Sequence, residues 1–571
     1  MYFFKASIEN NRYLKYFLFF LLGGIYLFIT KFKGFYTIYS NQETYFLHGL
    51  SMANKGFLVN DWYVHKVFHH HFAFGYIVLL MEKLGGVKTW VHIFQFLCMG
   101  MVSYGIYLIA NSFSKLPSLV WLITLSWIGF VGPGDFGLGW QQVFVGYLMP
   151  SEVSGGFLVF GFGLLFSRSY FLAGLSLGLG GLFHGAHLAS FALPILGASF
   201  ECGVWKNKKN FFKFCGPFTF LWGIFSIIVI YKMLTISGGN DETMATMVNF
   251  RNKGDLQIEK WGLWDTLAWH MWILPALFIS KLNSQKIFFR NTLVITFVFC
   301  LINILQISFL KIDTITAMML WRSASLASLL SIIIISDKLL ESIFNKEALS
   351  TSLLIILSLS AAFLVWYAPS NIRIWWLLSF PLLYTVGHVR LKYNWLKLPS
   401  ITSLTLIFFS LVILRTFSIG LKKTKITQQY PEDSVEVSEL YKWINNNSEK
   451  DSMFIIPLDL KYFRYRANRS IVIDWKSVAQ LKGDISNWYE RVRDVLGLTH
   501  ERVVQEVKKV EYPNDILVKK SYNMFNWNRA EYIGKKYGAN FLVVYSKDHQ
   551  GNLPLERKVF ENRGYRVYKI N

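Results

Sequence analysis

The sequence is poor in cysteine. It has four cysteines (Cys98, Cys202, Cys215 and Cys300), all in or beside hydrophobic segments, and none after residue 300. This spacing provides neither a disulfide framework nor a Cys-x-x-Cys metal pair. The chain is therefore not a small domain held together by disulfides or by cysteine-bound zinc.

Charged residues are also scarce, at 16%, against 53% hydrophobic and 18% aromatic residues, and the mean hydropathy is +0.34. This balance is typical of a polytopic membrane protein. The net charge of +23 would suggest nucleic acid in a soluble chain. Here the basic residues occupy short loops, where they set topology and contact anionic headgroups. We expect membrane lipids as partners and no nucleic acid.

Two further features are missing. The first apolar run, residues 14–30, is long and lacks a small-residue cleavage site, so it predicts a retained first helix and not a cleaved signal peptide. The chain also shows no internal repeat and no low-complexity linker. An inverted-repeat transporter fold therefore gains no support from the sequence.

Long apolar runs are what the sequence has in abundance. About thirteen are long enough to cross roughly 30 Å of hydrocarbon as helices. They fall near residues 14–33, 91–113, 116–132, 148–166, 170–185, 186–201, 214–235, 266–281, 288–309, 319–336, 350–367, 373–389 and 401–420.

Basic residues in the short loops set the orientation. With thirteen helices, the clusters in 206–213, 281–290, 338–346 and 390–397 fall on the same side as Lys5, Arg12 and Lys15. The prediction is a cytoplasmic N-terminus, with everything after Gly420 outside. The localisation that follows is a bacterial inner membrane, with the C-terminal part periplasmic or extracellular.

The predicted fold is mainly α, with two domains. Residues 1–420 form the transmembrane domain, which includes an outer loop at 34–90. Residues 421–571 form a soluble extracytoplasmic α/β domain, because strand-like runs at 453–457, 470–474, 541–545 and 566–570 alternate with helical stretches at 437–447, 485–497 and 530–538. Residues 133–147 and the acidic 236–265 also fall outside, and 72–81 is too short to span and predicts an interfacial helix.

The first outer loop collects ionisable residues: Glu43, Asp61, His65 and the run from His69 to His71. Carboxylates placed where a membrane helix emerges are partly desolvated, and such groups serve as general bases or metal ligands. Alternatively, Glu43 and Asp61 are solvated loop carboxylates, or they form ion pairs with Lys55 and Lys66. Three consecutive histidines lack the i,i+4 spacing of a helical zinc site. We predict no metal ligands and no resident cofactor, with a divalent cation left open.

Four further residues lie in or beside helices. His184 and His187, three apart, share a helix face and are either ligand groups or polar residues satisfied at a helical turn. Arg322 in an apolar segment suggests a phosphate site, or a structural pair with Glu152 or Asp313. Glu152 lies near the outer end of its helix.

In the C-terminal domain, Arg464, Arg466 and Arg469 follow one strand, and Asp474-Trp475-Lys476 closes the next. Such arginines bind pyrophosphate or a charged glycan, or else form a solvated face or dock the domain to its helices.

The order of these segments resembles the GT-C class of membrane glycosyltransferases. Asn41-Gln42-Glu43-Thr44-Tyr45 stands where that class has its Asp-Glu motif, and Asn60-Asp61-Trp62 resembles the Gly-Asp-Trp of aminoarabinose and mannosyl transferase relatives. His69-His70-His71 stands where those relatives have Lys-Pro-Pro. A bacterial branch of the class is similar in SEVSGG (151–156), GLFHGAH (181–187), a helix that starts at Arg322, and FIIPLDLKYFRYRANRSIVIDWK (454–476).

The resemblance implies transfer of a sugar from a polyprenyl-phosphate donor in the outer leaflet to a glycan, lipid or protein acceptor. Glu43 or Asp61 is then the base. The substrate-binding candidates are Gln42, His65, His69, His70, His71, Glu152, His184, His187, Arg322, Arg464 and Arg469.

Gln42 departs from the pattern, because it stands where the class has its catalytic Asp, and an amide accepts no proton from a hydroxyl. Either Glu43 or Asp61 takes over that role, or the branch has lost transfer activity.

Two other functions stay open: a non-enzymatic transporter or surface-polysaccharide assembly component, and a polysaccharide polymerase or ligase. Ion-coupled transporters place ionisable groups at the bilayer midplane. Here these groups fall at the outer ends of helices, which favours chemistry at the outer leaflet.

Overall fold

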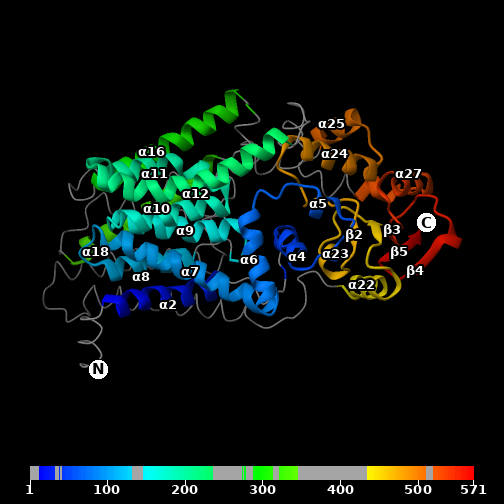
Figure 1. The fold of residues 1–571 in the computed structure, drawn as a ribbon, viewed down its shortest axis with the longest axis horizontal. Helices are drawn as coiled ribbons and strands as arrows, with labels where there is room; N and C mark the ends of the chain where they lie inside the picture. The colour runs from blue at the N-terminus through cyan, green and yellow to red at the C-terminus, as the bar shows by residue number, and fades with distance from the viewer. Residues whose placement is uncertain are drawn as a thin grey trace, which may run out of the picture.

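The computed structural model describes residues 12–31, 38, 41–130, 146–235, 273, 276–277, 287–310, 312, 320–344, 434–509 and 519–570. Long helices lie side by side in one part of the molecule, and a small mixed sheet with its own helices forms the other (Figure 1). Short helices from the first loop lie between the two parts. The expectation of a mainly helical chain with a C-terminal α/β domain is confirmed.

The long helices coincide with predicted apolar runs, because a chain in hydrocarbon must satisfy its backbone groups within each helix. They are α2 (Arg12–Lys31), α7 (Val87–Asn111), α8 (Pro117–Phe130), α9 (Pro150–Phe166), α10 (Tyr170–Phe183), α11 (Gly185–Glu201), α12 (Lys208–Thr235), α16 (Ile287–Leu305) and α18 (Ala324–Phe344). Short turns adjoin them: η2 (Val204–Lys206), η6 (Gln306–Leu310) and η7 (Leu320–Ser323).

Within the described ranges, five stretches are long and apolar enough to cross a membrane: Tyr13–Lys31, Val87–Asn111, Lys208–Lys232, Asn291–Leu310 and Leu320–Lys338. Shorter apolar helices accompany them. The predicted count of thirteen is not confirmed. The runs at 350–367, 373–389 and 401–420 and most of 266–281 lie outside the described residues, as do residues 133–145, loop 236–265 and the domain boundary at 420.

Small residues let the bundle pack closely. A Cβ on Gly105 of α7 would lie 2.6 Å from the carbonyl oxygen of Val159 in α9, and one on Gly163 would lie 2.7 Å from the carbonyl oxygen of Gly105. Such contacts bring helix backbones together where lipid supplies no hydrophobic drive for association. These helices hold the α10–α11 turn in place.

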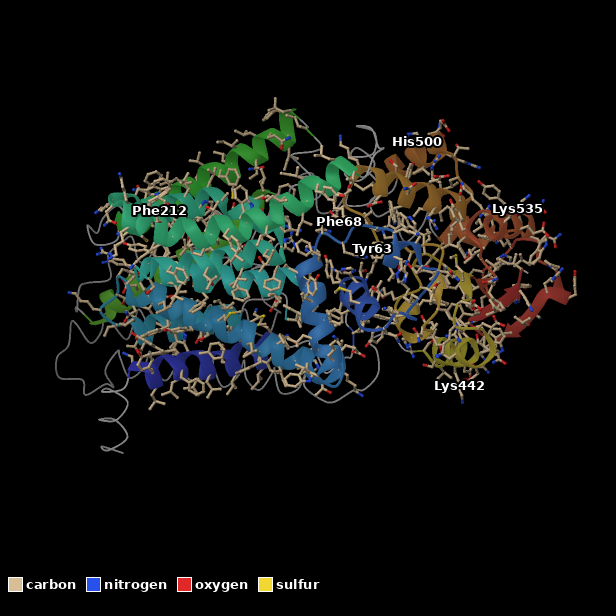
Figure 2. All side chains as sticks on the ribbon, viewed as in Figure 1. Tyr63, Phe68, Phe212, Lys442, His500 and Lys535 are labelled. Atoms are coloured by element: carbon tan, nitrogen blue, oxygen red, sulfur yellow. The ribbon has the colours of Figure 1, made fainter. Side chains whose placement is uncertain are left out.

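The basic turn before α12 lies at the end of the bundle far from the sheet domain. Figure 2 shows Phe212 at that end, whereas Tyr63 and Phe68 lie at the junction with the sheet domain. The predicted topology requires this separation, since it assigns the basic loops and the C-terminal domain to opposite sides. Which side is cytoplasmic stays a prediction.

The first loop folds into four short helices: α3 (Gln42–Tyr45), α4 (Leu47–Ala53), α5 (Trp62–His65) and α6 (Phe72–Lys83). The predicted helix at 72–81 is thus present as α6. It packs on α4 through Gly49 and Gly75, where a Cβ would meet Val78 and His48. The loop is therefore a folded layer and not an open connection.

The C-terminal sheet has the strand order β2-β1-β3-β5-β4. Its strands are β1 (Met453–Ile455), β2 (Ser470–Ile471), β3 (Phe541–Tyr545), β4 (Lys558–Glu561) and β5 (Tyr565–Lys569). β1 pairs in parallel with β2 and β3, whereas β5 pairs antiparallel with β3 and β4. The predicted strands are present, and β4 is an addition.

Helices cover both faces of this sheet, because the buried strands carry apolar residues on both sides. On one face Phe454 and Val543 pack against Leu440. On the other Ile455 and Leu542 pack against a layer that contains Trp488. The helices are α22 (Val435–Asn447), α23 (Phe463–Arg466), α24 (Lys482–Leu496), α25 (His500–Lys509) and α27 (Trp527–Tyr537), with the turn η8 (Leu555–Arg557).

Candidate functional site

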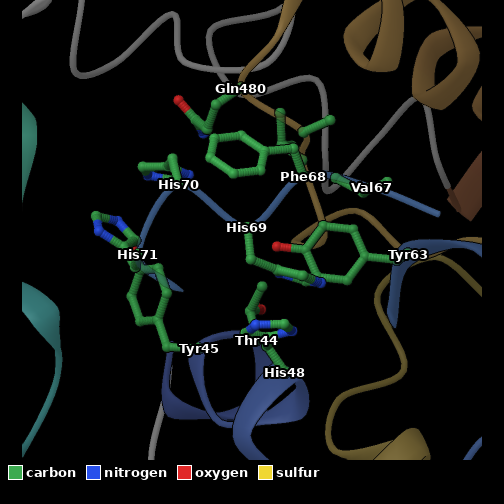
Figure 3. Close-up of a pocket in the computed structure, with 12 residues that line it drawn as sticks. Thr44, Tyr45, His48, Tyr63, Val67, Phe68, His69, His70, His71 and Gln480 are labelled. Carbon is green, nitrogen blue, oxygen red and sulfur yellow. The ribbon is translucent and has the colours of Figure 1, made fainter. Parts of the chain in front are cut away.

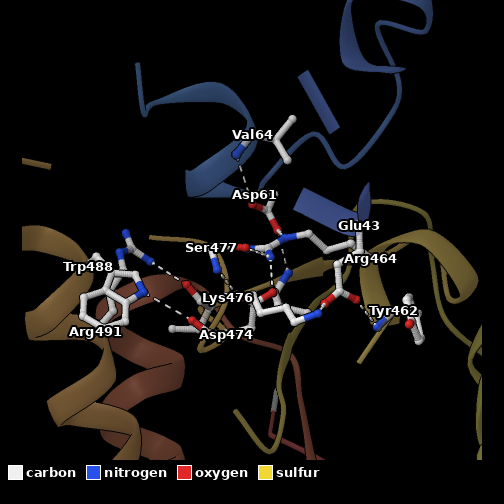
Figure 4. Close-up of polar contacts among 12 residues, drawn as sticks. Glu43, Asp61, Val64, Tyr462, Arg464, Asp474, Lys476, Ser477, Trp488 and Arg491 are labelled. Atoms are coloured by element: carbon white, nitrogen blue, oxygen red, sulfur yellow. Dashed lines mark hydrogen bonds and ion pairs between the residues drawn. The ribbon is translucent and has the colours of Figure 1, made fainter. Parts of the chain in front are cut away.

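Asp61 ties the first loop to the sheet domain (Figure 4). Its Oδ1 accepts a hydrogen bond from the Val64 N–H at 3.2 Å and so caps α5. Its Oδ2 accepts from Arg464 Nε at 2.6 Å and from the Ile471 N–H at 3.1 Å. The residue is 1% exposed. Both carboxylate oxygens are thus engaged.

The Arg464 guanidinium continues this network into the sheet domain. Its Nη1 lies 2.5 Å from Asp474 Oδ2 and 2.6 Å from Ser477 Oγ. Burial opposes the charge, but Asp61 and Asp474 hold the pKa of Arg464 above its ordinary value. One buried cation is therefore shared between two carboxylates from segments some 400 residues apart in the chain.

Glu43 makes a second connection between the same two parts. Its Oε2 accepts a hydrogen bond from the Tyr462 N–H at 2.6 Å, and its Oε1 lies 3.0 Å from Lys476 Nζ. Burial raises the pKa of Glu43, with Asp474 adding to the shift and Lys476 opposing it. Its contacts are again those of an interface residue.

Three weaker contacts extend this surface, which we call the docking interface (Glu43 and 60–68 of the first loop, and 451–491 of the sheet domain). Asn60 Nδ2 donates to the Asp451 carbonyl at 2.7 Å, and the Phe68 N–H donates to Asp484 Oδ2 at 3.3 Å. The guanidinium of Arg491 lies 4.8 Å from the ring centre of Trp62.

These contacts revise what the sequence suggested for the two acids. Both were expected as catalytic bases, yet each carboxylate is buried with its oxygens on donors of the sheet domain. Their ion-pair partners are Lys476 and Arg464 in place of Lys55 and Lys66. Arg464, a candidate for substrate binding, makes the contacts of a residue that joins the first loop to the sheet domain.

A pocket lies at the docking interface, between the first loop and residues 478–480 of the sheet domain (Figure 3). We call it the imidazole pocket, and its lining residues are Thr44, Tyr45, His48, Tyr63, Val67, Phe68, His69, His70, His71, Val478, Ala479 and Gln480. Its cavity volume is about 20 Å³, room for about one water molecule. None of these lining residues carries a carboxylate, an ammonium or a guanidinium.

The imidazoles of the pocket are neutral at pH 7. Burial lowers the pKa of His69 to about 3, and His48 adds to the effect. Burial, with the nearby Arg322, lowers the pKa of His70 to about 3. The pKa of His71 is likewise lowered well below its ordinary value by burial and by His70. Each ring therefore has one donor and one acceptor nitrogen.

Backbone carbonyls fix which nitrogen carries the proton in two of these rings. His69 Nε2 lies 3.2 Å from the Val64 carbonyl, and His71 Nδ1 lies 3.3 Å from the Phe183 carbonyl. A carbonyl only accepts, so both of those nitrogens are protonated. The Nε2 of His71 consequently carries an unprotonated lone pair.

Arg322 and the α10–α11 turn form a group next to His71. The ring centres of His71 and His184 are 4.6 Å apart, and those of His184 and His187 are 4.1 Å apart. Arg322 Nη1 lies 3.4 Å from His184 Nε2, and His187 Nδ1 lies 3.2 Å from Ser154 Oγ. Residues 112 to 138 positions apart are thus brought together.

His184 shows an unusual pairing of donors. Its Nδ1 accepts the His187 backbone N–H at 3.2 Å and caps α11. In a neutral ring the proton then lies on Nε2, which faces the Arg322 guanidinium, itself only a donor. Two donor nitrogens therefore lie 3.4 Å apart, and an anionic oxygen placed beside them would accept from both.

Two predicted residues of the first loop have local tasks. Gln42 is buried, and its Nε2 donates to the Leu148 carbonyl at 2.9 Å, which ties α3 to the start of α9. His65 is exposed on α5 with its Nε2 3.1 Å from the Phe57 carbonyl. Neither lines the imidazole pocket.

Glu152 and Arg469 do not line the pocket either. Glu152 is 1% exposed in the first turn of α9, two residues before Ser154. Arg469 donates to the carbonyls of Asn445 and Ser448 at the C-terminus of α22, the end that favours a cation. Arg469 thus stabilises a helix end, and the expectation that it binds substrate is not supported by these contacts.

Several site residues escaped the sequence analysis. His48, Tyr63, Phe68 and Gln480 line the pocket, but each stands in an ordinary helical or loop context with no motif to mark it. Ser477 directly follows Asp474-Trp475-Lys476, which the sequence analysis named as a candidate segment. Its position next to that segment was the one feature of the sequence that could have identified it. Among the described residues, no group of three or more His, Cys, Asp and Glu side chains is placed to hold a metal ion.

Comparison with known proteins gives a limited family match. Residues 435–495 match a family model described as a domain of unknown function (DUF6798). No curated protein matches the chain. Among solved structures, it is similar to the archaeal oligosaccharyltransferase AglB from Archaeoglobus fulgidus, in complex with an inhibitory peptide and a dolichol-phosphate. The identity is 10%, the TM-score is 0.47, and the match covers 93% of this chain and 69% of that chain. The family segment contains the sheet-domain side of the docking interface, from Asp451 to Arg491.

Proposed function

We propose that this chain is a GT-C-type membrane glycosyltransferase that moves a sugar from a polyprenyl-phosphate carrier to a glycan, lipid or protein acceptor. The observation that carries the proposal is the facing pair of donors, Arg322 Nη1 and His184 Nε2, 3.4 Å apart. A phosphate oxygen between them would accept from both, and charge-assisted hydrogen bonds of this kind are the strong ones. The apolar tail of the carrier suits a site among membrane helices.

The proposed location is the outer leaflet of a bacterial inner membrane. The donors lie on η7 and the α10–α11 turn, next to His71 at the start of α6 and so close to the docked sheet domain. With the N-terminus cytoplasmic, the sheet domain is periplasmic and covers this end of the bundle. A lipid-linked donor would then reach Arg322 laterally from the bilayer.

The chemical step follows from the protonation of the imidazoles. The acceptor hydroxyl attacks the anomeric carbon, the bond between that carbon and the phosphate oxygen breaks, and its electron pair leaves with the phosphate. The hydroxyl proton goes to the Nε2 lone pair of His71, since its Nδ1–H is held by the Phe183 carbonyl. Burial is the main cause of the low pKa of His71, and a bound phosphate would offset the smaller contribution of Arg322.

A histidine base replaces the carboxylate that the resemblance implied. Glu43 and Asp61 serve the docking interface, where their oxygens already accept hydrogen bonds from the sheet domain. Gln42 is fixed on Leu148. The imidazole pocket, by contrast, offers neutral groups with an unshared acceptor nitrogen.

The test is mass spectrometry of lipid-linked sugars and surface glycans in cells with and without the gene. Loss of the gene should raise one lipid-linked sugar and remove one sugar from a surface glycan. Arg322→Gln should reproduce this loss, with turnover by purified protein lowered about 10- to 100-fold because one charged hydrogen bond to phosphate is gone. His92→Asn, a histidine of α7 packed on Phe28, is the matched control and should behave as wild type.

A non-enzymatic role in surface-polysaccharide assembly is the second candidate. The engagement of both loop carboxylates in docking favours it, because a binding protein needs no base. The two functions separate in the same experiment. A binding protein would leave the pool of lipid-linked sugars unchanged in His71→Gln, whereas a transferase would accumulate the donor in that variant.

A further inference from the structure

We infer that Arg464 is a positioning residue that sets the separation of the two walls of the imidazole pocket. One wall belongs to the first loop (Tyr63 and 67–71), and the other belongs to the sheet domain (478–480). Arg464 lies between the segments that lead into these walls and binds both (Figure 4). The inference rests on the proposed function only for what the pocket binds.

The first-loop wall is attached to Arg464 at two points. The ion pair to Asp61 holds the residue that caps α5, and α5 leads directly into the wall. In addition, the guanidinium carbon lies 5.5 Å from the ring centre of Tyr63, which lines the pocket itself. A shift of Arg464 would therefore move both the start of α5 and one wall residue.

The sheet-domain wall is attached at two points as well. Arg464 Nη1 binds Asp474 at 2.5 Å and Ser477 Oγ at 2.6 Å, and Ser477 directly precedes Val478. The Ser477 N–H donates to Asp474 Oδ1 at 2.6 Å, which makes a compact turn of this segment. The wall at 478–480 thus begins at a turn that the guanidinium fixes.

A planar guanidinium suits this task because its donors stand at fixed angles. Nε donates to Asp61 on the first-loop side, and Nη1 donates to Asp474 on the sheet-domain side. The planar guanidinium therefore fixes the distance between these two carboxylates. The residue is 4% exposed, and water does not screen these contacts. The cavity between the walls is narrow, with room for about one water molecule.

Arg469 provides a matched comparison within the same domain. It is also buried, at 5% exposed, and its hydrogen bonds go to Ser448 and to carbonyls of 445–468. None of these hydrogen bonds reaches the first loop. A purely structural arginine of the sheet domain should therefore affect α22 and leave the pocket walls unchanged.

The experiment is hydrogen exchange on the full chain in lipid nanodiscs, with Arg464→Lys, Arg464→Leu and Arg469→Lys. Lysine keeps the positive charge but lacks the planar guanidinium that directs donors at two carboxylates. We expect Arg464→Lys to raise amide exchange at least about tenfold in both 62–71 and 474–482, with thermal unfolding close to wild type. Arg464→Leu should raise it further in the same two segments. Arg469→Lys should raise exchange at 443–450 only.

Unchanged exchange at 62–71 in Arg464→Lys, or equal effects of Arg469→Lys there, would overturn the inference. Arg464→Lys should also lower kcat with the lipid-linked donor about tenfold with little change in KM, since His71, the proposed base, lies in the wall that moves. Arg322 and His184, the proposed phosphate donors, are not part of that wall. If wild type shows no turnover but the exchange pattern appears, the proposed function fails and the positioning role stands.

Discussion

At the scale of single residues, burial decides which ionisable groups do chemistry and which hold the fold. Asp61 and Arg464 are almost fully buried and bound to each other, so both contribute to the contact between the first loop and the sheet domain. The rings of His69, His70 and His71 are neutral because burial disfavours their charge. Sequence patterns find such residues one by one but do not show which of them are mutually satisfied.

Asp61→Asn should weaken docking strongly. The change leaves the buried Arg464 with a single carboxylate, and breaking a buried ion pair from one side costs about 3–5 kcal/mol. Limited proteolysis of the first loop should become at least tenfold faster. Asp548→Asn, at an exposed position of the sheet domain, should leave the rate unchanged. Equal rates in wild type and Asp61→Asn would show that the network does not hold the domain.

Glu43→Gln should have an effect that depends on pH. Burial raises the pKa of Glu43 above its ordinary value of 4.5. A raised pKa means that the protonated group stabilises the folded state below that value, and that this contribution is lost as pH rises through the folded pKa. Glutamine, always neutral, removes this dependence.

The measurement is the thermal midpoint of both proteins between pH 4 and pH 8. At pH 8 the variant should be at least as stable as wild type, and the difference should shrink toward pH 4. A variant less stable than wild type at pH 8 would show instead that the Lys476 ion pair outweighs the cost of burial.

At the scale of helices and strands, the sequence was informative wherever the environment is uniform. A helix in lipid must be apolar over its whole length, so the runs at 14–33, 91–113 and 148–166 predicted α2, α7 and α9 within a few residues. Short elements were missed. β4 alternates in exposure at the sheet edge, and α23 is a single turn, so neither leaves a periodic pattern.

The α7–α9 contact gives a prediction at this scale. Gly105→Ala should destabilise the bundle by about 1–3 kcal/mol, because the new Cβ would lie 2.6 Å from a backbone oxygen of α9. Gly216→Ala in α12 is the control, since nothing lies within 4 Å of its Cβ position. It should be neutral or slightly stabilising, as alanine favours a helix over glycine. Urea or thermal unfolding in detergent measures both, and equal effects would contradict the packing argument.

At the scale of the whole molecule, the site comes from segments that no local pattern connects. His71 meets Phe183 across 112 residues, Arg322 meets His184 across 138, and Arg464 meets Asp61 across 403. The sequence named most of these residues as candidates. It could not predict that the acids turn toward the sheet domain while the imidazoles gather with Arg322, because that division depends on how the layers stack.

The docking of two such distant segments has a consequence for biosynthesis. At about 5–20 residues per second, a ribosome needs roughly 20–80 s to make the 403 residues that separate Asp61 from Arg464. During that interval the Asp61 carboxylate of the nascent chain has no Arg464 to bind, and it is accessible to water or to a chaperone. A chain stalled before residue 464 would therefore lack the contact that joins the first loop to the sheet domain.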